Sequence, residues 1–180
     1  PLTSILLTGL GQLQKLTCKN NLLTSLNASS LTNLITLDCS YNDLTTINVA
    51  GLTNLTDLNC TDNNITAIDL TGMSGLLKLQ CFNNQLTTID LSQATQLTSL
   101  YCSGNQFSSL NVSMLTNLTN LGCGNSQLTA LDLTALTGLI SLSVVNTQIS
   151  SIDLSTLVNL TGIGSGWNPL LNPLDISNHV

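Results

Sequence analysis

The sequence contains no arginine and no glutamate, and charged residues make up 7% of it, against roughly 25% in ordinary soluble domains. Its formal net charge of -6 comes from nine aspartates and three lysines, Lys15, Lys19 and Lys78. Binding to nucleic acid or to an anionic membrane surface requires a cluster of basic side chains that neutralises phosphates. We therefore expect neither nucleic acid nor a lipid surface as a partner.

Catalytic side chains are also scarce. The single histidine, His179, stands next to the last residue, and the many Ser and Thr hydroxyls have no neighbouring base to activate them. Nucleophilic and acid–base catalysis need a positioned base or a poised pair of carboxylates. We therefore expect no catalytic residues, no cofactor and no enzymatic activity.

Long apolar runs are absent as well. No segment approaches the roughly 20 apolar residues that cross a bilayer as a helix, so the sequence predicts no membrane insertion. The chain starts at Pro1, without an initiator methionine or a signal-peptide pattern. We interpret this start as that of a processed or excised segment.

The dominant feature of the sequence is a repeat of 21 residues. Leucines from Leu16 to Leu142 and asparagines from Asn21 to Asn105 recur at this interval, and so do all the cysteines: Cys18, Cys39, Cys60, Cys81, Cys102 and Cys123. A fixed period of roughly 20 to 50 residues is the signature of a solenoid, in which each repeat forms one coil.

One unit, residues 31–51, shows the pattern. Its first half reads Leu34-x-x-Leu37-x-Cys39-x-x-Asn42-x-Leu44, which resembles the leucine-rich-repeat consensus with Cys in place of the third Leu. Its second half repeats the apolar spacing. The nested form is similar to the short bacterial repeats called IRREKO, whose second half, Leu-x-x-Leu-Asp-Leu, is matched closely by residues 86–91 and 128–133.

The resemblance covers nearly the whole chain. We expect one solenoid over residues 1–180, with a partial coil at 1–9, coils that start at residues 10, 31, 52, 73, 94, 115 and 136, and an irregular last coil at 157–180. Alternate residues of a strand face opposite sides, so Leu37 and Cys39 are predicted to point inward and Thr36, Asp38 and Ser40 outward. The expected fold is a leucine-rich-repeat solenoid with a parallel β-sheet on one face. Its other face has room for extended or turn structure, or a second short parallel sheet, with little helix and low curvature.

Two columns of identical residues are interpreted as architecture. Inward cysteines behave as small apolar side chains, and Val144 takes their place in the following coil. Because side chains in register rarely give a relaxed disulfide dihedral and a column offers no tetrahedral grouping for zinc, we expect free thiols. The Asn column, continued by Ser126 and Thr147, is predicted to satisfy backbone groups at the turn.

A third column lies outside the second half of the coils and consists of Asn27, Asn48, Asp69, Asp90, Asn111, Asp132 and Asp153. Neighbouring aspartates of like charge favour either a bound cation or a raised pKa. Against calcium, each coil supplies only one carboxylate. A solvated ladder is the preferred interpretation.

The outward residues of the first strand form the usual ligand surface of the family. Aromatic rings mixed with amides and charges suit contact with protein or carbohydrate. The candidate ligand-binding residues are therefore Tyr41, Asp57, Asn59, Lys78, Gln80, Phe82 and Tyr101. A merely soluble sheet face is the alternative.

Farther along this face the outward positions become small, and we expect exposed backbone at Gly122, Gly124, Ser141, Ser143, Gly162, Gly164 and Gly166. A solenoid also has open ends that normally carry caps. No plain cap is recognisable in the sequence, although Trp167, Pro169 and Pro173 are candidates for a modest stop. Self-association at the ends is therefore a further expectation.

Three functions are consistent with these features. The resemblance implies a non-enzymatic binding module of a secreted or cell-surface bacterial protein, with an adhesin-like role and an extracellular location. The second is a structural subunit that assembles head-to-tail, or through its Gly-rich face, into a fibre. The third is ice binding, which is motivated by the hydroxyl column of Thr46, Thr88, Ser109 and Ser151 and opposed by Ala67 and Ala130 within it.

Overall fold

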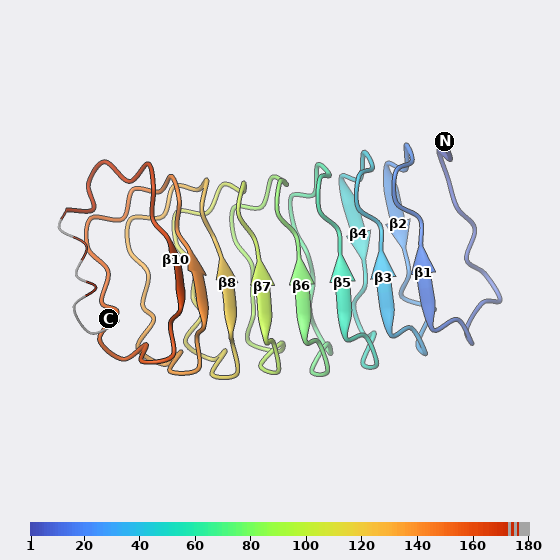
Figure 1. Ribbon diagram of the computed structural model, residues 1–180. Helices are drawn as coiled ribbons and strands as arrows, with labels where there is room; N and C mark the ends of the chain where they lie inside the picture. The colour runs from blue at the N-terminus through green and yellow to red at the C-terminus, as the bar shows by residue number, and fades with distance from the viewer. Residues whose placement is uncertain (173, 175, 177–180) are drawn as a thin grey trace.

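The computed structural model describes residues 1–172, 174 and 176. In this part the chain winds into a stack of similar coils, with the first and last coils at opposite ends and no helix (Figure 1). The solenoid and its parallel sheet are thus confirmed. Pro173 and His179, which entered the sequence predictions, lie outside the described residues.

Each coil contributes one short strand to an eight-stranded parallel sheet. Strands are joined in consecutive coils with a constant offset of 21, as in Leu37 opposite Leu58 and Leu58 opposite Leu79. The residue at the centre of each strand, a leucine in the first seven and Ile163 in the last, points into the coil, and its two neighbours point outward. The strands are β1 (Lys15–Thr17), β3 (Thr36–Asp38), β5 (Asp57–Asn59), β6 (Lys78–Gln80), β7 (Ser99–Tyr101), β8 (Asn120–Gly122), β9 (Ser141–Ser143) and β10 (Gly162–Gly164).

The opposite side of the solenoid is less regular. A two-stranded parallel sheet forms there from β2 (Ser25–Asn27) and β4 (Thr46–Asn48), with Leu26 opposite Ile47. Later coils keep the same inward apolar residues in extended and turn structure without further strands. Both forms predicted for this side, a short second sheet and extended chain, are therefore present.

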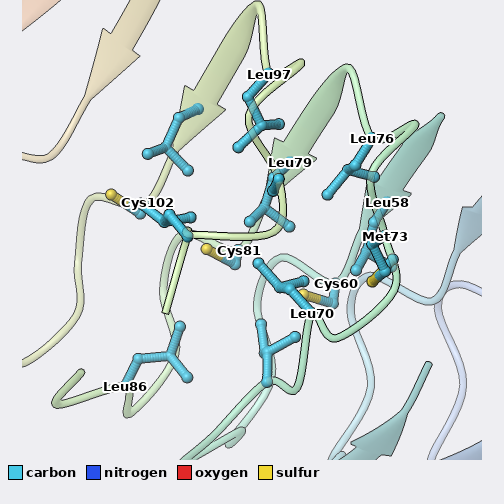
Figure 2. Close-up of a cluster of buried hydrophobic side chains, with 14 of the residues drawn as sticks. Leu58, Cys60, Leu70, Met73, Leu76, Leu79, Cys81, Leu86, Leu97 and Cys102 are labelled. Atoms are coloured by element: carbon cyan, nitrogen blue, oxygen red, sulfur yellow. The ribbon is translucent and has the colours of Figure 1, made fainter. Parts of the chain in front are cut away.

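Rows of leucine and cysteine fill the interior (Figure 2). Every cysteine is a buried free thiol, as expected, and Val144 is buried in the same row. Burial raises the pKa of the Cys81 thiol well above its usual value and raises that of Cys123 to about 12. The thiols therefore act as neutral apolar packing groups.

The asparagine column closes the turn that follows each strand of the large sheet. The Asn63 amide donates to the carbonyls of Cys39, Cys60 and Thr61, and its Oδ1 accepts the Leu44 amide proton at 3.0 Å. Buried backbone groups of two coils are thereby satisfied by one side chain. The predicted architectural role is confirmed. Ser126 keeps one of these bonds. In the last coil the Asn168 amide donates to the carbonyls of Val144 and Ser165, and its Oδ1 accepts the Thr147 amide proton.

The residue before each asparagine has a left-handed backbone conformation. The column is Asn20, Tyr41, Asp62, Asn83, Gly104, Asn125, Asn146 and Trp167, with φ between 49° and 68°. Asn, Asp and Gly tolerate this region well, whereas bulky side chains seldom adopt it. Tyr41 and Trp167 are therefore unusual residues for this position of the turn.

Some outward positions are not exposed as predicted. Ser40 is buried, with its hydroxyl donating to Asp38 Oδ1 at 2.6 Å, and the equivalent Thr61 of the next coil is buried as well. Gly122 and Gly124 are also buried, since side chain or backbone from Tyr101 and Val145 lies directly over them. The expected strip of bare glycine backbone is thus interrupted in this coil.

Candidate binding surfaces

Four of the candidate ligand-binding residues lie together on the large sheet. Asp57 pairs in register with Lys78, and Asn59 with Gln80, so adjacent strands bring two charges and two amides side by side. These residues line a small depression of about 170 Å³ together with Thr36, Leu37 and Asp38 of β3 and Leu58 of β5. The depression offers hydrogen-bond donors, acceptors and charges of both signs at one place.

Local hydrogen bonds hold the acidic and amide side chains of this depression. The Thr56 hydroxyl donates to Asp57 Oδ2 at 2.7 Å, and Asn59 Oδ1 accepts the Thr61 amide proton at 3.2 Å. A neighbouring ion pair joins Lys19 and Asp38 at 3.8 Å. Because that pair is on the surface, it contributes little stability. Asp57 and Lys78 form no ion pair within the described part of the chain.

The two aromatic candidates border the depression on the C-terminal side. Tyr101 is opposite Gln80 in the next strand, and Phe82 follows β6 by two residues. Both rings are half-buried. They supply rigid apolar area beside the polar depression, which is the composition typical of binding hot spots.

Tyr41 is not part of this cluster. It occupies the left-handed turn beyond β3, with 54% of its surface exposed, and it is two coils away from the coil that carries Phe82. The structure therefore brings together six of the seven predicted residues, and Tyr41 lies apart from them.

The Asp/Asn column forms a series of identical turns. The Oδ1 atom accepts the amide proton of the residue two positions on, as in Asp90 with Ser92 at 2.9 Å. That backbone bond, followed by the Ser92 hydroxyl, lowers the pKa of Asp90, and similar bonds lower the pKa of Asp69, Asp132 and Asp153. The raised pKa considered from the sequence is thus wrong, because local donors outweigh repulsion between exposed carboxylates.

No group of three or more His, Cys or Asp side chains in the described residues could hold a metal ion. In the carboxylate column the backbone uses only Oδ1 of each Asp, as in Asp90. The solvated ladder stays a prediction.

Sequence reasoning missed a column of exposed amides two residues beyond the left-handed turn. It runs through Asn64, Gln85, Gln106, Gln127 and Gln148. Gln85 donates to Asn64 at 3.2 Å, and in the adjacent left-handed column Asn83 donates to Asp62 and Asn146 to Asn125. The signal in the sequence that identifies this column is the 21-residue period, which relates Asn64 to Gln85 and Gln85 to Gln106.

An open hollow of about 500 Å³ lies at the C-terminal end of these amide columns. It is lined by Asn146, Gln148, Trp167, Asn168 and Pro169. The Trp167 side chain is 85% exposed. Sequence reasoning treated Trp167 as part of a terminal stop and gave it no ligand.

Comparison with protein families gives a match to "Leucine Rich repeats (2 copies)" over residues 32–72. Comparison with curated proteins gives no significant match. The described residues contain no helix long and apolar enough to cross a membrane.

Solved bacterial structures share the fold. The functional domain of InlJ from Listeria monocytogenes, which includes a cysteine ladder, is 35% identical with a TM-score of 0.88, over 91% of this chain and 36% of that one. The internalin inlF of the same species is 31% identical with a TM-score of 0.69, over 82% and 48%. YopM from Yersinia enterocolitica is 28% identical with a TM-score of 0.74, over 87% and 34%. The chain thus spans less than half the length of each of these structures.

Proposed function

This chain is a leucine-rich-repeat protein with short 21-residue coils of the bacterial type, and on that premise we propose that it is a non-enzymatic binding module of a secreted or cell-surface bacterial protein. Leucine-rich-repeat proteins are typically protein-interaction modules, and solenoids of this kind present extended surfaces to their ligands. Similarity to Listeria internalins supports the surface or secreted location.

The proposed contact surface is the outward face of β5, β6 and β7. The observation that carries the proposal is the register that sets Asp57 beside Lys78 and Asn59 beside Gln80, next to Tyr101. Charges of both signs give orientation and specificity to a protein contact, while the half-buried rings provide apolar area that a partner can cover.

A protein is favoured over a small ligand because the volume of the depression is small. Its volume of about 170 Å³ is below the roughly 300 to 1,000 Å³ of ordinary small-molecule sites. A carbohydrate on the same face is the alternative, and the experiment below distinguishes the two.

The test is to probe the purified chain against an array of extracellular protein domains and an array of glycans. A specific protein bound by the chain should lose affinity at least tenfold with the double variant Phe82→Ala/Tyr101→Ala. The matched control is Ile35→Ala/Leu77→Ala, which removes two exposed apolar side chains just before the strands and should leave affinity unchanged. Equal binding by wild type and the Phe82/Tyr101 variant would reject this face.

The fibre and ice-binding alternatives have weaker support. Assembly into a fibre through exposed glycine backbone has less surface to use, because Gly122 and Gly124 are buried. Ice binding needs a continuous hydroxyl column, which the exposed Ala67 and Ala130 interrupt. Light scattering over a range of concentrations tests the first alternative, and thermal hysteresis tests the second.

A further inference from the structure

A second site is suggested by the hollow beside Trp167, on the turn edge of the solenoid rather than on the sheet face. Trp167 follows β10, three coils beyond the coil of Tyr101. The hollow of about 500 Å³ falls within the size range of ligand sites and is lined by one indole ring, one proline and three amides, without a charged group. It is therefore chemically distinct from the charged depression on β5 and β6.

The backbone of Trp167 is held in an uncommon conformation without compensation from packing. Its φ is 60°, where Asn, Asp or Gly stands in six of the eight coils. A bulky residue in the left-handed region is strained, and this side chain remains 85% exposed, so burial of the ring does not offset the strain. Strained and exposed residues of this kind are concentrated at functional sites.

Of the three amide side chains around the ring, that of Asn168 is held by several hydrogen bonds, whereas those of Gln148 and Asn146 keep unbonded polar atoms. The Asn168 amide donates to the carbonyls of Val144 and Ser165, and its Oδ1 accepts from both the backbone and the hydroxyl of Thr147. By contrast, the Gln148 side chain makes no hydrogen bond to any residue that the structure describes. Asn146 uses its amide group toward Asn125 at 3.0 Å and keeps its Oδ1 available.

We propose that the hollow binds a neutral oligosaccharide. The apolar face of a pyranose ring would stack on the Trp167 indole, since an exposed aromatic ring offers rigid apolar area. Its hydroxyls would bond to the Gln148 amide and to Asn146 Oδ1, because an amide both donates and accepts. The uncharged lining and the net charge of -6 favour an uncharged sugar over an anionic one.

The column of exposed amides extends from the hollow along the solenoid. From Gln148 it continues through Gln127 and Gln106, whose side chains also make no hydrogen bond within the described chain. Successive coils are about 4.8 Å apart, a spacing comparable with one pyranose in an extended β-linked chain. A sugar chain that starts at Trp167 can therefore meet one free amide per residue.

Trp167 is the single tryptophan of the chain, so its fluorescence reports directly on the hollow. Titration with cellohexaose or chitohexaose should give a saturable change in emission for at least one of them. Gln148→Ala should weaken that binding at least tenfold. Its matched control, Gln96→Ala, removes an exposed glutamine from the opposite turn and should leave the titration unchanged.

Calorimetry extends the test to Trp167→Asn, which installs the residue type that the column favours and should fold normally but lose oligosaccharide binding. The double variant Phe82→Ala/Tyr101→Ala should retain it, so failure of the sheet-face proposal and failure of this one are separable. Absence of any response to both oligosaccharides at millimolar concentration would overturn the proposal, as would equal affinity in Gln148→Ala or Trp167→Asn.

Discussion

The ring of Tyr101 lies against the backbone of Gly122 in the neighbouring coil. A β-carbon placed on Gly122 would be 3.4 Å from Tyr101 Cδ1, an ordinary contact. Two residues later the situation differs, because a β-carbon on Gly124 would meet the carbonyl oxygen of Val145 and come within 2.9 Å of its nitrogen. Tyr101 can adjust by rotation, whereas the backbone of Val145 cannot.

These two glycines therefore predict opposite results for the same substitution. Gly122→Ala should leave the free energy of unfolding unchanged or raise it by up to about 1 kcal/mol, because alanine is less flexible than glycine in a strand. Gly124→Ala should lower it by about 1 to 3 kcal/mol through overpacking. Urea denaturation of both variants checks this difference, and equal stability of the two would contradict the packing described for Val145.

The left-handed turn column predicts a stabilising substitution at Tyr41. Tyr41 has a φ of 55° and is 54% exposed, so replacement by asparagine loses little burial and relieves the backbone. Tyr41→Asn should raise the free energy of unfolding by roughly 1 kcal/mol. Asn83→Tyr, the reverse change two coils along, should lower it by a similar amount. A destabilised Tyr41→Asn variant would show that the ring contributes packing that its exposure does not reveal.

The buried thiols predict resistance to alkylation in the folded chain. Burial keeps the pKa of Cys81 well above 9.0 and that of Cys123 near 12, so the reactive thiolate is nearly absent at about pH 8. Iodoacetamide should label these residues only after unfolding in urea. Cys18, with a smaller rise in pKa and slight exposure, should react first. Rapid native labelling of Cys81 would place it outside the core.

The same pKa values set an alkaline limit on stability. The unfolded thiol ionises with a pKa of 9.0 and the folded Cys123 with one of about 12. The unfolded state therefore loses protons first, so the contribution of Cys123 to the free energy of unfolding should be constant below pH 9.0 and fall between pH 9.0 and about 12. Chemical denaturation at increasing pH checks this, with Cys123→Val as the variant in which the decrease becomes smaller.

The aspartate column sets the acid limit. Hydrogen bonds from Thr71 and Ser92 lower the pKa of Asp69 and Asp90 below their usual value of 3.8. Their stabilisation is fully present above the unfolded pKa and is lost as the pH falls below 3.8 through the folded pKa. Asp90→Asn keeps an Oδ1 acceptor, as Asn111 does toward Ser113, and should reduce the acid sensitivity without loss of stability at neutral pH. An unchanged acid profile would contradict the role of this bond.

Much of the fold was predictable because one period governs it. The interval between Cys39 and Cys60 fixed the length of a coil, and the alternation of Leu37 and Cys39 fixed which side chains point inward. The same interval also placed Asp57 beside Lys78, because residues 21 apart must be neighbours in a solenoid. Asn168 was missed as a member of the Asn column, since the last coil departs from the consensus around it.

The sequence by itself determined the rows: which residues stack on which, which row is buried, and that the free thiols belong to the core. Only the tertiary structure decided how neighbouring rows cover one another, as Tyr101 covers Gly122, Val145 covers Gly124 and Ser40 donates to Asp38. The hollow beside Trp167 also belongs to this second category. The physical reason is that the period specifies contacts along a row, whereas contacts between rows depend on the direction each side chain takes in space.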